Sequence, residues 1–87
     1  MSHIQNLTNN NYQVLEYLYD KADKQNCVRI TQSEVAKDFN LTRNTMNSIF
    51  KNLREFGYLV TDAEFSTKHY LTDIGVKIVE TFKKIEE

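Results

Sequence analysis

The segment that most constrains the fold of this chain spans residues 31–59 and reads TQSEVAKDFNLTRNTMNSIFKNLREFGYL. Its apolar residues are spaced for two helices joined by a tight turn. Ala36 stands where two helices would cross closely, and Asn40 follows at the turn. The other apolar positions of the pair are Val35, Phe39, Leu41, Met46 and Ile49. This spacing buries the elbow between the helices and leaves the outer face of the second helix free.

Polar residues mark the ends of both helices. Thr31 is followed by Glu34 at the spacing of a capping box, in which side chains bond the free amides at a helix start. Asn40 suits the turn because asparagine, after glycine, best tolerates a left-handed backbone. Thr42 is expected to cap the second helix, and Gly57 to end it.

One helix and one short strand are expected before this pair. Residues 9–11 are asparagines, which offer caps for a helix start. The apolar stripe of that helix consists of Tyr12, Leu15, Leu18, Tyr19 and Ala22. Polar residues 23–26 end the helix, and residues 27–30 alternate in the manner of a short strand.

A hairpin and a last helix are expected after the pair. Residues 58–61 and 68–72 read as two strands, joined by the turn-prone residues 62–67. Thr72 and Asp73 are placed to cap the last helix. Its apolar stripe consists of Ile74, Ile78, Val79, Phe82 and Ile85.

Length and composition favour one small ordered domain. The chain has 87 residues, of which 40% are hydrophobic, with no proline and 2 glycines. We expect residues 1–87 to form a single domain in which residues 1–10 are flexible and residues 73–87 form the C-terminal helix. The chain is too small for a cleft between two lobes, and it offers no nucleophile–base set, phosphate loop or acid pair. An enzyme is therefore not expected.

Location and cofactors are also constrained. No run of about 18 apolar residues occurs, and residues 1–10 lack the basic start and apolar middle of a signal peptide. A cytoplasmic protein without membrane contact is expected. Cys27 is the only cysteine. The only two histidines are His69 and His3, and His3 lies in the segment expected to be flexible. Neither a metal nor another cofactor is therefore expected.

Charge is unevenly distributed along the chain. The net charge of −1 gives little support for binding a polyanion. Residues 42–60 nevertheless carry an excess of positive charge, whereas the segments on either side are slightly acidic. The charged residues of this segment are Arg43, Lys51, Arg54 and Glu55. The second helix of the pair is thus the element best suited to meet phosphates.

The expected order of helix, strand, helix, helix, strand, strand and helix is that of a winged helix-turn-helix domain. Residues 53–59, LREFGYL, and residues 70–75, YLTDIG, resemble the pattern L-x-x-x-G-h-h … Y-x-L-T-x-x-G of MarR-like and PadR-like transcriptional regulators. This resemblance covers about residues 11–85. It implies a mostly α fold: a three-helix bundle, a small β-hairpin or wing, and a C-terminal helix. In such proteins the second helix of the pair enters the DNA major groove.

The outer face of that helix is almost purely hydrogen-bonding. An ordinary solvated face favours Glu and Lys, whereas the Asn, Ser and Thr found here weaken a helix by a few tenths of a kcal/mol each relative to alanine. Asparagine reads adenine edges, and arginine reads guanine or holds the backbone. The expected DNA-binding residues of this helix are Thr42, Arg43, Asn44, Thr45, Asn47, Ser48, Lys51, Asn52 and Arg54.

The wing offers a less charged surface. Its only basic residues are Lys68 and His69, and Asp62 and Glu64 oppose contact with phosphates. The residues expected to contact DNA are Ser66, Thr67 and Lys68. A hairpin that merely covers the core stays an open alternative.

Two roles are open for the apolar stripe of the last helix. It packs against the first helix of the same chain, or it pairs with a second copy, as the matching element does in MarR-like and PadR-like proteins. The resemblance favours a homodimer, which suits palindromic half-sites. The expected interface residues are Ile74, Ile78, Phe82 and Ile85.

The sequence therefore predicts a small dimeric transcriptional regulator, a repressor, that binds double-stranded DNA through the second helix of the pair. Two alternatives stay open: a winged-helix module for protein–protein interaction, and a plasmid or phage replication or partition DNA binder. Effector binding also stays open. Full-length MarR proteins usually carry additional helices around an effector pocket, whereas this chain has room for one helix after the wing.

Overall fold

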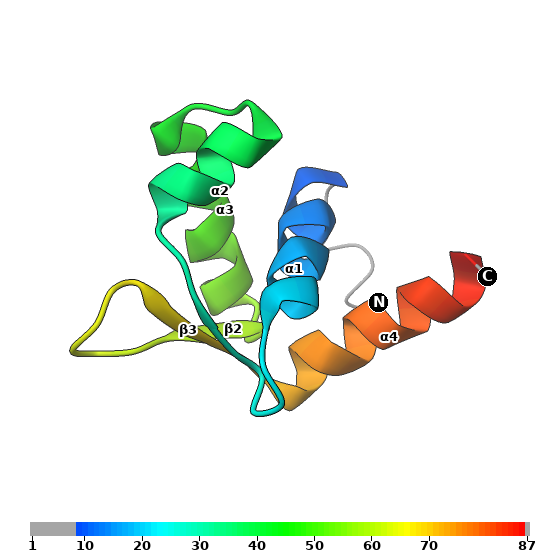
Figure 1. Ribbon diagram of the computed structural model, residues 1–87. Helices are drawn as coiled ribbons and strands as arrows, with labels where there is room; N and C mark the ends of the chain where they lie inside the picture. The colour runs from blue at the N-terminus through cyan, green and yellow to red at the C-terminus, as the bar shows by residue number, and fades with distance from the viewer. Residues whose placement is uncertain (1–8, 87) are drawn as a thin grey trace.

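The computed structural model describes residues 9–86, which form helices packed around a small three-stranded antiparallel sheet (Figure 1). The elements in chain order are α1 (Asn9–Lys21), β1 (Cys27–Arg29), α2 (Gln32–Phe39), α3 (Arg43–Glu55), β2 (Leu59–Thr61), β3 (Lys68–Leu71) and α4 (Asp73–Glu86). This is the predicted order, and the mostly α winged-helix architecture is confirmed.

The start of α1 differs from the prediction. The helix begins at Asn9, so Asn10 and Asn11 lie inside its first turn and do not cap it. Asn11 is buried, because it precedes Val14 by three residues and so lies on the same helical face. Residues 9 and 10 were expected to be flexible and are helical. The rest of that expected segment, residues 1–8, lies outside the described residues.

The turn between α2 and α3 follows the predicted chemistry. The backbone amide of Glu34 donates to Thr31 Oγ1 over 3.1 Å, and the Glu34 carboxylate accepts from the Thr31 amide over 3.2 Å, which completes the capping box. Asn40 adopts the left-handed conformation with φ 57° and ψ 42°. The Leu41 amide then donates to the Ala36 carbonyl over 2.9 Å, which closes the elbow. The helix-turn-helix is therefore specified by local sequence.

β3 is the central strand of the sheet, with β1 on one side and β2 on the other. Its residue His69 lies opposite Val28 of β1 and Thr61 of β2. The wing comprises β2, β3 and the loop of residues 62–67 between them. In Figure 1 this loop (yellow) projects away from the helices on the side opposite the end of α4.

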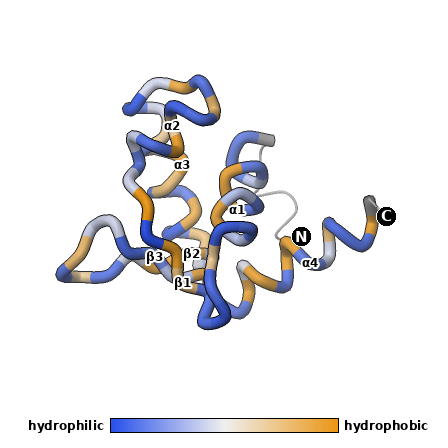
Figure 2. Tube along the Cα trace, viewed as in Figure 1, coloured by the Kyte–Doolittle hydropathy of each residue, from blue (hydrophilic) through white to orange (hydrophobic). Residues whose placement is uncertain are grey.

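The core lies between α1, α3 and the sheet. Its largest fully buried side chains include Tyr58, Phe50, Leu15, Leu18, Met46 and Leu53. α4 joins this core through Val79, which is fully buried, and its hydrophobic and hydrophilic positions alternate along its length (Figure 2). The start of α4 lies so close to the backbone of Tyr58 that a Cβ at Gly75 would collide with the Tyr58 carbonyl oxygen. Only glycine allows this approach.

Candidate nucleic-acid interface

The inner face of α3 fixes the helix to the core. Met46, Ile49, Phe50 and Leu53 are buried, in the stripe that helical spacing predicts. Thr42 caps the helix, because its Oγ1 accepts the backbone amide of Thr45 over 3.1 Å. With one face held in this way, the opposite face of α3 points to solvent along most of the helix.

The outer face of α3 carries polar side chains that are free to bind a partner. The exposed residues of α3 that make no side-chain hydrogen bond or ion pair with other described residues are Arg43, Asn44, Asn47, Ser48, Lys51 and Glu55. Thr42 and Thr45 are also exposed, but the Thr42 hydroxyl donates to Thr45 Oγ1 over 2.8 Å. The two threonines therefore serve the helix cap first.

Asn52 and Arg54 were also expected to contact DNA. Both are half-buried. The Arg54 guanidinium donates from Nη1 to Thr61 Oγ1 of β2 over 3.3 Å. The structure therefore places Arg54 at the junction between α3 and the wing, apart from the exposed outer face.

A hollow of about 410 Å³ lies next to the start of α3, between three segments that are separate in the sequence. It is lined by Thr31, Gln32, Ser33, Arg43, Ser66 and Thr67. It thus brings together the start of α2, the first residue of α3 and the wing loop. Sequence reasoning expected Arg43, Ser66 and Thr67 at the interface but missed Gln32 and Ser33. The capping box marked a helix start there, yet nothing in the sequence indicated that the wing folds back beside it.

Most polar groups of the wing bond within the wing itself. Asp62 Oδ1 accepts the backbone amides of Glu64 over 2.8 Å and of Phe65 over 3.1 Å. These hydrogen bonds lower the pKa of Asp62. The Lys68 ammonium lies 5.5 Å from the centroid of the Tyr70 ring. His69, counted in the sequence as a basic group of the wing, has no exposed surface and points into the core. The wing therefore presents little positive charge.

The expected dimer residues on α4 fall into two groups. Phe82 packs edge-on against Tyr12 of α1, with ring centroids 4.5 Å apart, and Ile78 is half-buried against the core. These two residues serve packing within the chain. Ile74 and Ile85 are 45% and 69% exposed and remain available to another molecule.

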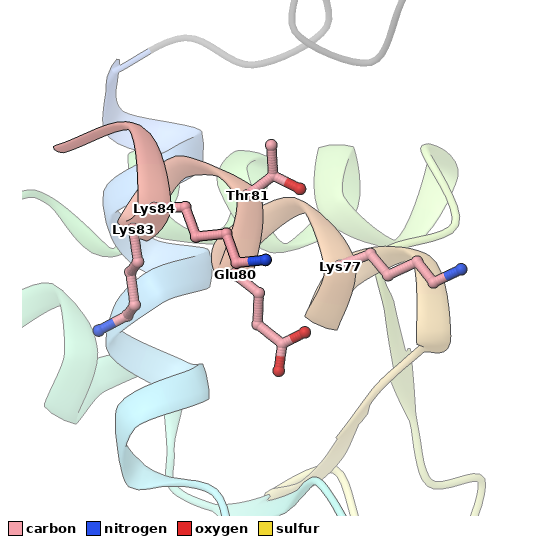
Figure 3. Close-up of a pocket in the computed structure, with 5 residues that line it drawn as sticks. All are labelled: Lys77, Glu80, Thr81, Lys83 and Lys84. Carbon is pink, nitrogen blue, oxygen red and sulfur yellow. The ribbon is translucent and has the colours of Figure 1, made fainter. Parts of the chain in front are cut away.

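A second hollow lies along the outer side of α4 (Figure 3). Its lining residues all come from this one helix and are Lys77, Glu80, Thr81, Lys83 and Lys84. Lys83 is already engaged with α1, since its ammonium lies 3.1 Å from Asp20 and 3.9 Å from Glu16. This hollow is therefore the solvated side of an amphipathic helix.

Within residues 9–86, no cluster of His, Cys, Asp and Glu has the arrangement of a metal site. Across the same residues, no helix is long and apolar enough to cross a membrane.

Solved structures provide the comparison. The MepR–DNA complex of Staphylococcus aureus is 29% identical over 95% of this chain and 59% of that chain, with a TM-score of 0.73. MepR itself, a transcription regulator of the S. aureus multidrug efflux pump MepA, is 28% identical over 95% of this chain and 59% of that one, with a TM-score of 0.75. The fold of this chain matches the MarR-type winged helix.

A more distant structure shares the fold of this MarR-like winged helix. The adhesin competence repressor AdcR of Streptococcus pyogenes is 21% identical over 92% of this chain and 56% of that chain, with a TM-score of 0.68. The chain spans about 60% of the length of the MepR chains that it matches. No protein-family model and no curated protein sequence matches the chain.

Proposed function

We propose that this MarR-like winged helix is a transcription regulator that binds double-stranded DNA in a sequence-specific way. The observation that carries the proposal is the outer face of α3, where Asn44, Asn47 and Ser48 are exposed and unpaired between Arg43 and Lys51. Asparagine amides bond adenine edges in the major groove, and arginine bonds guanine or phosphate. α3 is the second helix of a helix-turn-helix, the helix that enters the groove.

The hollow beside α3 supports a backbone contact next to the reading face. Gln32 and Ser33 at the start of α2, Arg43, and the wing residues Ser66 and Thr67 line it. Hydroxyl, amide and guanidinium groups are the donors that proteins direct at phosphate oxygens. A phosphate held there would fix the register of α3 in the groove while carrying no sequence information itself.

The comparison with MepR supports the same function, because MepR is a transcription regulator and forms a complex with DNA. Selection from a random duplex pool tests the proposal. We expect one enriched sequence, bound about 10³-fold or more tightly than a shuffled duplex. A pool without enrichment, or equal affinity for selected and shuffled duplexes, would contradict it.

We further propose that the protein binds as a homodimeric repressor through the end of α4. Ile85 is 69% exposed on a helix end that extends away from the other helices (Figure 1). An apolar residue at such a position is best buried against a second copy, and paired readers suit palindromic half-sites. The experiment is sedimentation of the protein and of Ile85→Glu at micromolar concentration.

We expect a dimer for the unaltered chain and a monomer for Ile85→Glu. Phe82→Glu is the poorer probe, because Phe82 also packs on Tyr12 within the chain. Lys84→Glu is a matched control, since it places the same charge one residue away on the exposed lysine-bearing side. A monomeric unaltered protein, or an Ile85→Glu variant that stays dimeric, would contradict the α4 interface.

One observation favours a second candidate, a module that binds another protein through the wing. Phe65 is 58% exposed and Val60 is 51% exposed, close to the acidic Asp62 and Glu64. An apolar and acidic tip is a poor match for phosphates and a fair match for a basic protein surface. Phe65→Ser separates the candidates, because it should leave affinity for the selected duplex unchanged if the wing tip binds protein.

A further inference from the structure

His69 occupies the centre of the sheet and is completely buried. Its ring centroid lies 5.1 Å from that of Phe50 on α3. In the sheet it lies opposite Val28 of β1 and Thr61 of β2. An ionisable side chain in such a place is costly unless it serves a purpose, because burial penalises its charged form.

A chain of side-chain contacts connects this ring to α3. His69 Nδ1 lies 3.0 Å from Thr61 Oγ1, and Thr61 Oγ1 accepts from Arg54 Nη1 over 3.3 Å. A guanidinium can only donate, so the Thr61 oxygen acts as acceptor toward Arg54. The Thr61 hydroxyl proton is then available for Nδ1. In this arrangement Arg54 donates to the Thr61 hydroxyl and the Thr61 hydroxyl donates to His69, so the hydroxyl has a partner both as acceptor and as donor.

This arrangement requires the neutral ring with an unprotonated Nδ1. The ring proton then sits on Nε2, a buried atom that has no hydrogen-bond partner within residues 9–86. An unsatisfied buried polar atom in a native fold calls for an explanation. The explanation here is that the other neutral tautomer, with the proton on Nδ1, would take away the acceptor of the Thr61 hydroxyl proton.

Protonation of the ring would weaken this chain. It turns Nδ1 into a second donor toward Thr61 Oγ1, so the Thr61 hydroxyl proton loses its acceptor. It also places a second positive charge near Arg54, which repels the guanidinium. The ring has beside it Phe50 and Arg54 on α3, Thr61 on β2, Val28 on β1 and the backbone of Ile30, and only Arg54 among them is charged. No acidic group therefore compensates the imidazolium.

We propose that His69 is a positioning residue: in its neutral form it holds Arg54, through Thr61, at the junction between α3 and the wing, and its protonation releases Arg54. The inference rests on the proposed DNA-binding function and adds Arg54, held at the wing junction, to its phosphate contacts. Burial lowers the pKa of His69 below its ordinary value of 6.5, although a hydrogen bond with the Ile30 backbone opposes the shift and the positive charge of Arg54 adds the smallest contribution to it. The neutral form therefore predominates at neutral pH.

The sign of the pH effect distinguishes this device from ordinary electrostatics. Acidification normally adds positive charge and strengthens binding to phosphates. Release of Arg54 has the opposite sign, so affinity for the selected duplex should fall as the pH drops below 6.5. The contribution of neutral His69 to the free energy of unfolding should also fall on acidification. It is fully present above pH 6.5 and is lost as the pH falls through the lowered pKa of His69 in the folded state.

A double-mutant cycle tests the connection at neutral pH. Thr61→Val keeps the shape of the side chain and removes the hydroxyl, so we expect affinity for the selected duplex to weaken about 3- to 10-fold. In an Arg54→Ala background the same substitution should have no further effect. Equal weakening by Thr61→Val in both backgrounds would overturn the proposal, as would unchanged affinity for Thr61→Val alone.

The pH dependence is tested with His69→Asn, because an asparagine oxygen reaches nearly the position of Nδ1 and cannot be protonated. We expect near-native affinity at neutral pH and no loss on acidification. His69→Leu, which fits an apolar core but has no acceptor, should bind as weakly as Thr61→Val at every pH. All proteins carry His3→Gln, so that His69 is the only histidine. An unaltered pH profile in His69→Asn would overturn the proposal.

A measurement without DNA separates this inference from the proposed function. In ¹⁵N NMR spectra of the free protein, the Nδ1 resonance of His69 should report an unprotonated acceptor and should shift in Thr61→Val. The protection of the Arg54 guanidinium against hydrogen exchange, relative to the intrinsic rate at each pH, should fall on acidification, except in His69→Asn. If these signals respond and no duplex is bound, the proposed function fails and the positioning role stands. If they do not respond, the positioning role fails.

Discussion

The outer face of α3 and the wing both carry polar side chains, but they use them differently. On α3, Asn44, Asn47 and Lys51 are exposed and bond no other described side chain. In the wing, the Asp62 carboxylate binds its own turn and Lys68 lies over Tyr70. Residue type alone already makes the wing the less basic of the two surfaces. The contacts leave the polar groups of α3 available to a partner, as our proposal that α3 reads DNA requires, whereas the wing uses several of its polar groups to hold its own shape.

The largest expected effect tests the wing as a structural element. The substitution Gly75→Ala puts a Cβ against the Tyr58 carbonyl at the base of β2. Because the obstacle is backbone, we expect a loss of about 3 kcal/mol or more in the free energy of unfolding. Urea denaturation followed by circular dichroism measures it.

Gly57→Ala is the control for that substitution. A Cβ at Gly57 meets nothing within 4 Å, but the residue has φ +83°. The left-handed backbone should cost about 1–2 kcal/mol. If Gly75→Ala were the milder of the two, α4 would be free to move away from the Tyr58 backbone, and the close contact between them would not hold the base of the wing.

The next effect tests α3 as the reading surface. Asn47→Ala should weaken binding to the selected duplex by about 1–3 kcal/mol and leave binding to a shuffled duplex nearly unchanged. Ser66→Ala in the wing should weaken both duplexes alike and by less, since a phosphate contact carries no sequence information. Fluorescence anisotropy titrations measure both. If Asn47→Ala weakened the affinity for both duplexes equally, Asn47 would not read the DNA sequence, and α3 would not differ from the wing in this respect.

A smaller effect concerns the salt dependence of binding. Each phosphate contact contributes about 0.9 to the slope of log affinity against log salt. Lys51→Ala should lower the magnitude of that slope by about this amount for each copy of the chain bound. Lys68→Ala should lower it less, because its ammonium lies over the Tyr70 ring. Titrations at several salt concentrations measure the slopes, and a larger change for Lys68→Ala would reverse the comparison.

The smallest expected effect is on stability and has opposite signs in the two regions. Asn47→Ala should raise the free energy of unfolding by about 0.5 kcal/mol, because alanine is the better helix former at an exposed position. Asp62→Ala should lower it, because the amides of Glu64 and Phe65 lose their acceptor. Urea denaturation measures both variants. Destabilisation by Asn47→Ala would mean that α3 also uses this residue for its own structure.

Local sequence was sufficient for much of the fold. The capping box of Thr31 and Glu34, the left-handed Asn40 and the cap at Thr42 each depend on groups a few residues apart. The buried stripes of α2 and α3 follow from helical period. The start of α1 was misplaced, because asparagines at 9–11 suit a cap and the buried position of Asn11 depends on distant packing.

For the candidate interface, the sequence predicted which face of α3 is exposed but not the state of each side chain. Arg43, Asn44 and Asn47 follow directly from the outer face of a helix. Arg54 was placed with them, yet it turns to Thr61 across the junction with the wing. The hollow beside α3 was not predictable either, because its lining residues at the start of α2 and in the wing loop are brought together only by folding.

The sequence by itself determined the elements, their order and the polar face of α3, because helical and strand periods and caps act over short distances along the chain. Only the tertiary structure decided that His69 is buried, that Arg54 belongs to the wing junction and that Phe82 packs on Tyr12 while Ile85 stays exposed. These outcomes depend on contacts between segments far apart in the sequence. Residue type and spacing cannot specify which neighbour a long side chain meets.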